Sequence, residues 1–261
     1  IAWGQYTQPE ALSRLDVADG ISTLEIARRA HQTSISIERP LPAGWLLRVG
    51  AYDKRETSAL PSFDNVFSSL VLTPEIEVDR LAYTSSEAHM SGVELTAQSD
   101  RGLPLNGWLS YSYSQARERI GGAWVARSWN QPHAVQTGLQ WRHGAWQVAG
   151  VFNWHSGWPY TPLLLSAAQW RDPTTVSLAL GARNSAHQKN FRSLDLRVSW
   201  TRPLPRGTLE ASLEVRNVFN SDNECCRDYQ VTHDDTGLYA LRESSRDWLP
   251  VTPLLGIRWR L

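Results

Sequence analysis

Two adjacent cysteines, Cys225 and Cys226, are the residues of this 261-residue chain whose chemistry is easiest to name. Neighbouring cysteines can close into a strained vicinal disulfide, which an oxidising compartment favours. Two thiols alone do not complete a zinc site, which needs four ligands. The pair therefore predicts a vicinal disulfide rather than a metal site, and the sequence leaves open whether the thiols are oxidised.

The seven histidines form no catalytic or zinc-binding signature. No two of them have the His-x-x-x-His spacing that places both imidazoles on one face of a helix, and no His-Glu-x-x-His motif is present. No Gly-x-Ser-x-Gly sequence provides a nucleophile elbow. We expect no catalytic residue, no metal, no cofactor and no enzyme.

The aromatic run Asn153–Tyr160 is the most distinctive local segment. Trp158 and Tyr160 have rings on which an aromatic or sugar-like ligand can stack. Tryptophan and tyrosine also collect at membrane interfaces, where they anchor a protein without binding a ligand. Both interpretations remain open at this point.

The composition excludes several classes of protein. With 26 basic and 26 acidic side chains the chain has no net charge, so it lacks the cationic surplus of a nucleic-acid binder. Its 41% hydrophobic and 20% charged residues are too balanced for disorder. No apolar stretch approaches the roughly 20 residues of a transmembrane helix. The chain starts in a strand-like pattern without an initiator methionine, so we expect it to be cut from a longer protein.

Apolar and polar residues alternate with period two through most of the chain, as in strands with one apolar face. In 194–200, for example, Leu194, Leu196 and Val198 alternate with Asp195 and Arg197. The same pattern predicts ten strands, near 1–7, 31–39, 45–56, 88–100, 107–116, 133–142, 146–156, 191–202, 207–219 and 250–261.

The connections between these strands alternate in length. Short ones are expected at 40–44, 101–107, 143–145 and 202–207, and long ones at 8–30, 56–87, 116–132, 157–190 and 220–250. Several strands have the 9 to 11 residues of a tilted membrane strand, more than the five or six usual in soluble sheets. Tryptophans near the short turns suggest an interfacial girdle: Trp45, Trp108, Trp141, Trp146, Trp200 and Trp259.

We therefore predict an all-β protein: an antiparallel transmembrane β-barrel portion of about ten strands, with short periplasmic turns and long extracellular loops. The polar sides of the strands are expected to face its lumen. These residues include Glu94, Gln136, Gln140, Arg142, Arg197, Glu214, Arg216 and Arg258.

The last hundred residues resemble the C-terminal end of TonB-dependent outer-membrane receptors. The sequence Leu213–Asn220 matches a penultimate strand that runs into an Asn-x-Phe segment. A long loop, 223–249, and a final alternating strand, 254–261, follow in the order seen in that family. The segment Gly92–Leu95 is similar to the Gly-Val/Ile-Glu opening of other strands in these receptors.

The resemblance implies uptake of a scarce ligand, of the siderophore, cofactor or saccharide class, across the outer membrane of a Gram-negative cell. Such receptors have about 22 strands around a plug domain. Residues 1–261 would then be the C-terminal portion of the barrel, without plug, TonB box or N-terminal strands. Expected partners are its own plug, the remaining strands, outer-membrane lipid, the TonB complex and a small-molecule ligand, but no nucleic acid. The lumen residues named above would face the plug.

Two alternatives remain open. A ten-stranded barrel complete in itself could act as a passive or adhesive outer-membrane protein. A soluble carbohydrate-binding β-sandwich would show the same alternation, because an antiparallel sheet can have one wet face.

Overall fold

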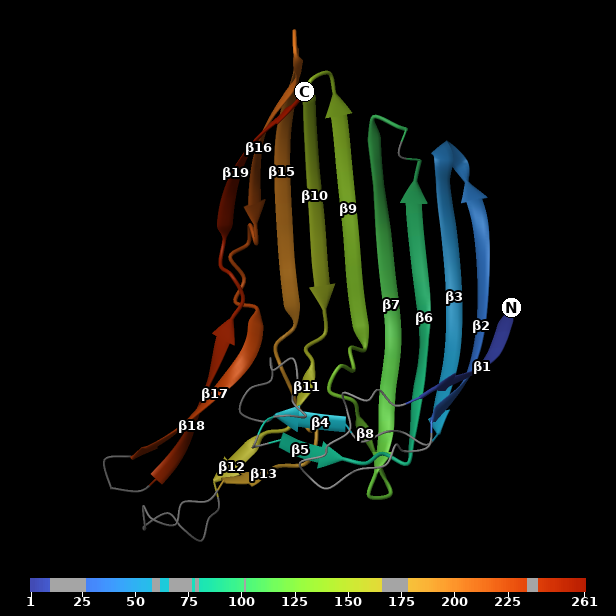
Figure 1. Cartoon of the computed structure of the whole chain (residues 1–261), viewed down its shortest axis with the longest axis vertical. Coiled ribbons are helices and arrows are strands. Elements are labelled where there is room, and N and C mark those ends of the chain that lie inside the picture. Colours follow the sequence, from blue (N-terminus) through green and yellow to red (C-terminus); the bar gives the residue numbers. More distant parts are fainter. Residues whose placement is uncertain are drawn as a thin grey trace.

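The computed structural model describes residues 1–9, 27–57, 62–65, 77, 80–100, 102–165, 178–233 and 239–261. Its main element is an antiparallel sheet whose long strands pair with one another in chain order (Figure 1). These strands are β1 (Ala2–Gln8), β2 (Arg28–Leu41), β3 (Trp45–Thr57), β6 (Glu87–Ser99), β7 (Leu105–Ile120), β9 (His133–His143), β10 (Trp146–His155), β15 (Phe191–Leu204), β16 (Gly207–Arg216) and β19 (Thr252–Arg260). The ten strands expected from the alternation are confirmed.

Short turns connect the strands at one end of the sheet. The 3-10 turn Pro42–Gly44 joins β2 to β3, with positive φ angles of 59° at Ala43 and 73° at Gly44. The described parts of the long connections lie at the opposite end (Figure 1). Within the described ranges no helix has the length and apolar character needed to span a bilayer.

Each strand places apolar and polar side chains on opposite faces. One face, here called the outer face, carries side chains such as Val93, Leu139, Leu196 and Ile257, which are 45%, 58%, 40% and 84% exposed. An apolar surface of this extent is unfavourable in water and is the surface that a transmembrane barrel presents to lipid. The other face, here called the lumen face, carries most of the charged residues of the membrane-spanning part.

Five of the predicted girdle tryptophans lie on the outer face near the short turns: Trp45, Trp141, Trp146, Trp200 and Trp259. The sixth, Trp108, was assigned wrongly. It lies on the lumen face directly opposite Gly138, where a Cβ atom would come within 2.5 Å of the indole Nε1. The absence of a side chain at Gly138 lets the ring lie against the sheet.

The long connections contain strands of their own, which the sequence did not predict. They are β4 (Ser62–Asn65) with β5 (Arg80–Tyr83), β8 (Ala123–Ala126) on β7, β11 (Pro159–Tyr160) with β14 (Ala186–His187), β12 (Leu163–Leu165) with β13 (Leu178–Leu180), and β17 (Glu224–His233) with β18 (Tyr239–Asp247). At this end of the sheet, Ala88, Met90 and Ala116 form a small buried cluster beside Tyr52.

Candidate functional site

The lumen face collects the polar residues predicted for it. Strand register places all eight on this face: Glu94, Gln136, Gln140, Arg142, Arg197, Glu214, Arg216 and Arg258. Arg197 is central to one group, with Nη2 at 3.2 Å from Glu210 Oε1 and Nη1 at 3.6 Å from Glu214 Oε2. Arg216 Nε lies 2.7 Å from Glu214 Oε1. These pairs neutralise much of the lumen charge on β15 and β16.

A groove of about 690 Å³ lies over the lumen side of β2, β3, β6 and β7. Glu94 and Lys54 line it, together with the ion pair between Arg48 and Glu38. Tyr52 lies across Gly92, where a Cβ atom would be 2.8 Å from the ring. The groove is therefore lined by polar and charged side chains.

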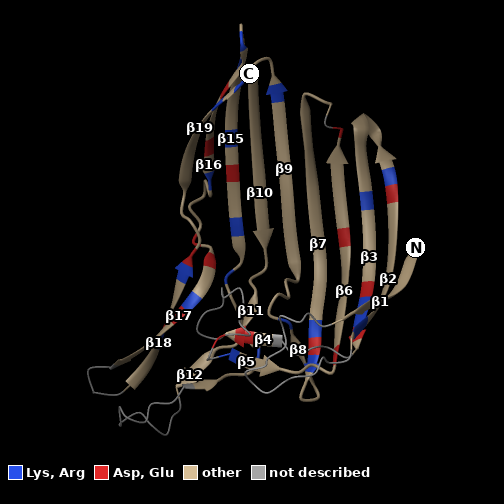
Figure 2. Cartoon of the chain, in the orientation of Figure 1, with Lys and Arg blue, Asp and Glu red and all other residues tan. Residues whose placement is uncertain are grey.

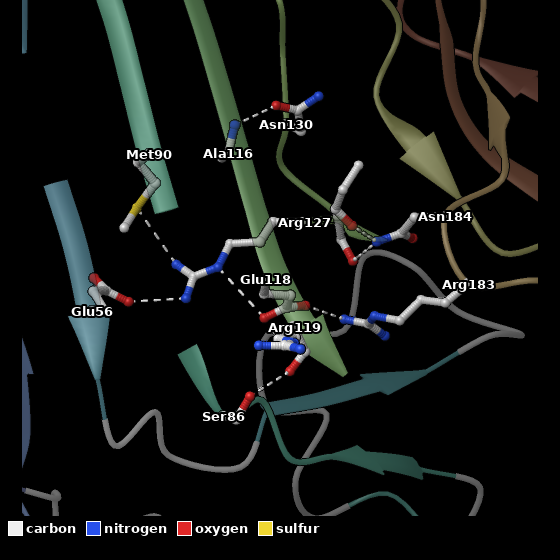
Figure 3. A network of polar contacts seen from close by, with 12 residues as sticks. Glu56, Ser86, Met90, Ala116, Glu118, Arg119, Arg127, Asn130, Arg183 and Asn184 are labelled. Atoms are coloured by element: carbon white, nitrogen blue, oxygen red, sulfur yellow. Dashed lines mark hydrogen bonds and ion pairs between the residues drawn. The ribbon is translucent and has the colours of Figure 1, made fainter. Parts of the chain in front are cut away.

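A buried ion network lies at the loop end of the sheet, next to the groove residue Lys54 (Figure 3). Glu56 on β3 and Glu118 on β7 are each only 4% exposed. Arg127, which follows β8, joins them: its Nη2 is 2.9 Å from Glu56 Oε2 and its Nε is 3.5 Å from Glu118 Oε2. Lys54 and Arg28 also pair with Glu56, at 2.8 Å and 3.9 Å.

Arg183, which lies between β13 and β14, extends this network into the loops. Its two terminal nitrogens bind Asp64 at 2.6 Å and Glu118 at 3.1 Å, and its guanidinium lies 3.6 Å from the centre of the Tyr83 ring. Burial disfavours the charged guanidinium, but Asp64 and Glu118 outweigh burial and raise the pKa of Arg183. The neighbouring Asn184 amide donates to the Ala126 carbonyl at 2.6 Å. Segments from three long connections, those that follow β3, β7 and β10, are thus fastened together.

This network was missed by the sequence analysis. The strand predicted at 107–116 stops short of Glu118, whereas β7 continues to Ile120. The alternation does continue, because Ala116 and Glu118 are buried while Arg117 and Arg119 are exposed. A longer strand prediction would have placed Glu118 on the lumen face, but no sequence pattern indicates its partner Arg183.

Three aromatic rings stack at the loop end of β10 and β15. His155 at the end of β10 stacks on Phe191 of β15 with ring centres 4.8 Å apart. Trp158 also stacks on His155, with the two ring centres 5.4 Å apart. Trp158 is only partly buried, so part of the indole remains accessible.

Tyr160, the second predicted ligand-binding residue, contacts the β17–β18 hairpin. Its hydroxyl donates to Glu243 Oε1 at 3.1 Å, and the Arg227 guanidinium lies 4.0 Å from its ring centre. Arg227 also pairs with Glu243 and with Glu224, the latter at 3.1 Å. Burial raises the pKa of Tyr160 to about 12, with Glu243 adding to the effect and Arg227 opposing it. The hydroxyl and the ring of Tyr160 are thus both in contact with other groups of the protein.

The Asn-x-Phe segment forms the base of the last long connection. Asn217 has a φ of 49° and is 5% exposed. Its backbone N–H donates to Asp195 Oδ1 at 2.9 Å, and its side chain exchanges hydrogen bonds with the backbone of Ser221. Asparagine tolerates this left-handed conformation and supplies both a donor and an acceptor. The motif therefore ends β16 and starts the loop.

Cys225 and Cys226 lie at a β-bulge where β17 starts, with their sulfur atoms 2.6 Å apart. They are free thiols in this structure, and the vicinal disulfide remains a prediction. Burial and the neighbouring Cys225 raise the pKa of the Cys226 thiol to about 11. Among the described residues no group of His, Cys, Asp and Glu side chains could hold a metal ion.

Comparison with known proteins identifies relatives of this fold. The family model "TonB dependent receptor-like, beta-barrel" matches residues 7–218. The ferripyoverdine receptor of the outer membrane of Pseudomonas aeruginosa is 16% identical, with a TM-score of 0.56 over 98% of this chain and 30% of that chain. The outer membrane transporter YddB from Escherichia coli is 11% identical, with a TM-score of 0.56 over 97% of this chain and 38% of that one.

A third structure, the FrpB iron transporter from Neisseria meningitidis (F3-3 variant), is 16% identical, with a TM-score of 0.50 over 88% of this chain and 31% of that chain. At these identities the likeness shows the fold. The chain spans 30% to 38% of the length of these three structures. A comparison with curated proteins found no match.

Proposed function

Because the chain belongs to the TonB-dependent receptor β-barrel family, we propose that it forms the C-terminal part of the barrel of a receptor that takes up a siderophore-like ligand. Proteins of this family are transport receptors of the Gram-negative outer membrane. The N-terminal strands, the plug and the TonB-contacting segment would come from the rest of the receptor. The chain itself would carry out no catalysis.

The observation that carries this proposal is the division of one sheet, with ten long strands in chain order, into an apolar outer face and a charged lumen face. A lumen lined by paired Arg and Glu suits a hydrated wall against which a plug can move. At the mouth, the network has four cations, Arg28, Lys54, Arg127 and Arg183, for three carboxylates, Glu56, Asp64 and Glu118. This surplus favours an anionic ligand such as a ferric chelate.

Trp158 and Tyr160 would have different roles in ligand binding. The accessible Trp158 ring, held by His155, would contact the ligand. Tyr160 would act indirectly, since it fastens the β17–β18 hairpin through Glu243 and Arg227. The predicted lumen residues on β6, β9, β15, β16 and β19 would face the plug.

Uptake of radioactive iron presented as ferric siderophores, including ferric pyoverdine, tests the proposal in iron-starved cells. Uptake should depend on the receptor gene and on TonB. Trp158→Ala should raise the half-saturating ligand concentration about fivefold, the worth of one ring stacking contact. Trp154→Ala removes the same ring from the outer face four residues away and should leave it unchanged. The proposal would be refuted if cells that lack the receptor gene, or cells that lack TonB, took up every ferric siderophore as well as wild-type cells do.

A self-contained passive barrel would require β1 to pair with β19, whereas these strands form the two edges of the described sheet. Unpaired strand edges in hydrocarbon cost several kcal/mol for each polar group. We therefore predict that the purified 261-residue chain aggregates in detergent unless the remaining strands are supplied. A monodisperse barrel with heat-modifiable gel mobility, formed by this chain alone, would instead support the passive barrel.

A further inference from the structure

The β-bulge at Cys225 and Cys226 changes which side chains share a face of the β17–β18 hairpin. Glu224 is opposite Asp247, and Cys226 is opposite Arg246. Cross-strand partners share a face and successive residues alternate, so Glu224 and Cys226 lie on opposite faces. In a regular strand, residues two apart would share one face. The extra residue of the bulge, Cys225, therefore lies on the same face as Cys226.

The bulge thus brings together two pairs of side chains, one pair on each face of β17. On one face the sulfur atoms of Cys225 and Cys226 are 2.6 Å apart, whereas adjacent side chains of a regular strand point to opposite faces. On the other face Arg227 Nη2 is 3.1 Å from Glu224 Oε2, although residues three apart in a regular strand also point to opposite faces. Both contacts therefore depend on the same bulge.

The pair of Glu224 and Arg227 fastens the hairpin to two other segments. Glu224 is buried, and its Oε2 also accepts a hydrogen bond from the backbone N–H of Lys189, just before β15, at 3.0 Å. Arg227 lies over the ring of Tyr160 and contacts Glu243. Figure 2 shows acidic and basic residues together in the half of the hairpin nearest the main sheet. Loss of one partner of a buried ion pair is strongly destabilising, so loss of the bulge would loosen the hairpin.

We propose that Cys225 and Cys226 form a redox site that controls this attachment: their disulfide fixes the bulge and the Glu224–Arg227 pair, and its reduction loosens both. The oxidant is the disulfide of a periplasmic thiol–disulfide oxidoreductase. One cysteine thiolate attacks it, expels one of its thiolates and forms a mixed disulfide. The second cysteine then attacks the sulfur of the first, forms the vicinal S–S bond and expels the other thiolate. In total the two cysteines lose two protons and two electrons, and the oxidant becomes a dithiol.

The chemistry of adjacent cysteines makes this site reversible. Only one thiolate is needed at a time, so the raised pKa of the Cys226 thiol slows closure without preventing it. The ring is strained, and strained disulfides are reduced more easily than ordinary structural ones. Both side chains are half-buried, which leaves them accessible to thiols. The inference depends on the contacts of the hairpin and not on which ligand the receptor takes up.

The first test is the mass of the tryptic peptide 217–227, which contains both cysteines because trypsin cuts after Arg216 and Arg227. The complete receptor is purified from outer membranes without reductant, denatured and treated with iodoacetamide. The peptide should be unalkylated and lighter by two hydrogen atoms than the dithiol, and a phosphine added first should make both cysteines react. Alkylation of both cysteines without the phosphine, or a disulfide to another molecule, would overturn the proposal.

The second test is hydrogen exchange of the β17 amides in the complete receptor, held in lipid nanodiscs. Closing the shortest possible loop restricts the open hairpin, so the amides of 227–233 should exchange about eightfold faster after reduction. Amides of β10 should exchange at the same rate before and after reduction. Cys225→Ser cannot close the ring and should exchange at the reduced rate with or without the phosphine. Equal rates in oxidised and reduced wild type would overturn the proposed control of the hairpin, and this comparison stands even if the variant folds poorly.

Discussion

Replacing Leu196 by arginine tests the assignment of the two faces of the sheet. Leu196 is the sixth of the 14 residues of β15 and lies on the outer face, opposite Gly150 and Val215. Its side chain is 40% exposed to the region that lipid would fill. An arginine near the midplane of a transmembrane barrel costs about 2–4 kcal/mol.

The neighbouring Arg197→Leu provides the matched comparison, because it changes the other face of the same strand. It removes the contacts of Arg197 with Glu210 and Glu214, but Glu210 keeps Arg260 at 3.2 Å and Glu214 keeps Arg216. The Arg197 side chain is 40% exposed, so screening limits the loss to about 1 kcal/mol or less. We expect Leu196→Arg to be the more damaging change by about 1–3 kcal/mol.

The assay is urea unfolding of the complete receptor in lipid vesicles, followed by the heat-modifiable gel band of the folded barrel. Leu196→Arg should lower the urea midpoint and the folding yield, while Arg197→Leu should stay close to the wild type. Equal midpoints, or a lower midpoint for Arg197→Leu, would show that the two faces are assigned the wrong way round.

Three further predictions concern the loop end. Tyr160 should release its proton near pH 12 rather than near 10, because the folded protein favours the neutral phenol. Its contact with the β17–β18 hairpin should therefore be intact below pH 10 and lost as the pH rises through 12. The measurement is the tyrosinate absorbance that is present in the wild type and absent in Tyr160→Phe. Arg183→Ala leaves the buried Glu118 with Arg127 alone and should cost about 3–5 kcal/mol of local stability by hydrogen exchange, whereas adding Glu118→Gln should recover part of it, and no recovery would contradict the network. Trypsin on intact cells should cut at the exposed Arg242 or Arg246 of β18 and spare Arg206 in a short turn, and cleavage at Arg206 would invert the topology.

The strands of the sheet could be predicted because one physical constraint acts on every second residue. Lipid on one side and water on the other impose the period of two, which 194–200 shows without interruption. The loops have no such constraint. Polar residues occupy both faces of the β17–β18 hairpin, so its sequence does not distinguish a strand from an irregular connection.

Contacts between distant segments were beyond the sequence for a different reason. Arg183 and Asp64 are 119 residues apart, and only the folded arrangement of two hairpins brings them to 2.6 Å. Trp108 was misassigned because its position near a turn matched the girdle, while its place in the alternation matched the lumen. For an aromatic residue near a strand end, the alternation is therefore the better guide.

The glycines beneath Tyr52 and Trp108 have a consequence for barrel assembly. A strand that slips by two residues keeps its apolar and polar faces, so hydrophobic patterning cannot reject that mispaired state. In a slipped β9, Gln136 or Gln140 would replace Gly138 under the Trp108 ring, where a Cβ atom would approach within about 2.5 Å. The same holds for Gly92 and Tyr52 between β3 and β6. Each ring and its glycine thus disfavour a two-residue slip, because any side chain that replaced the glycine would clash with the ring.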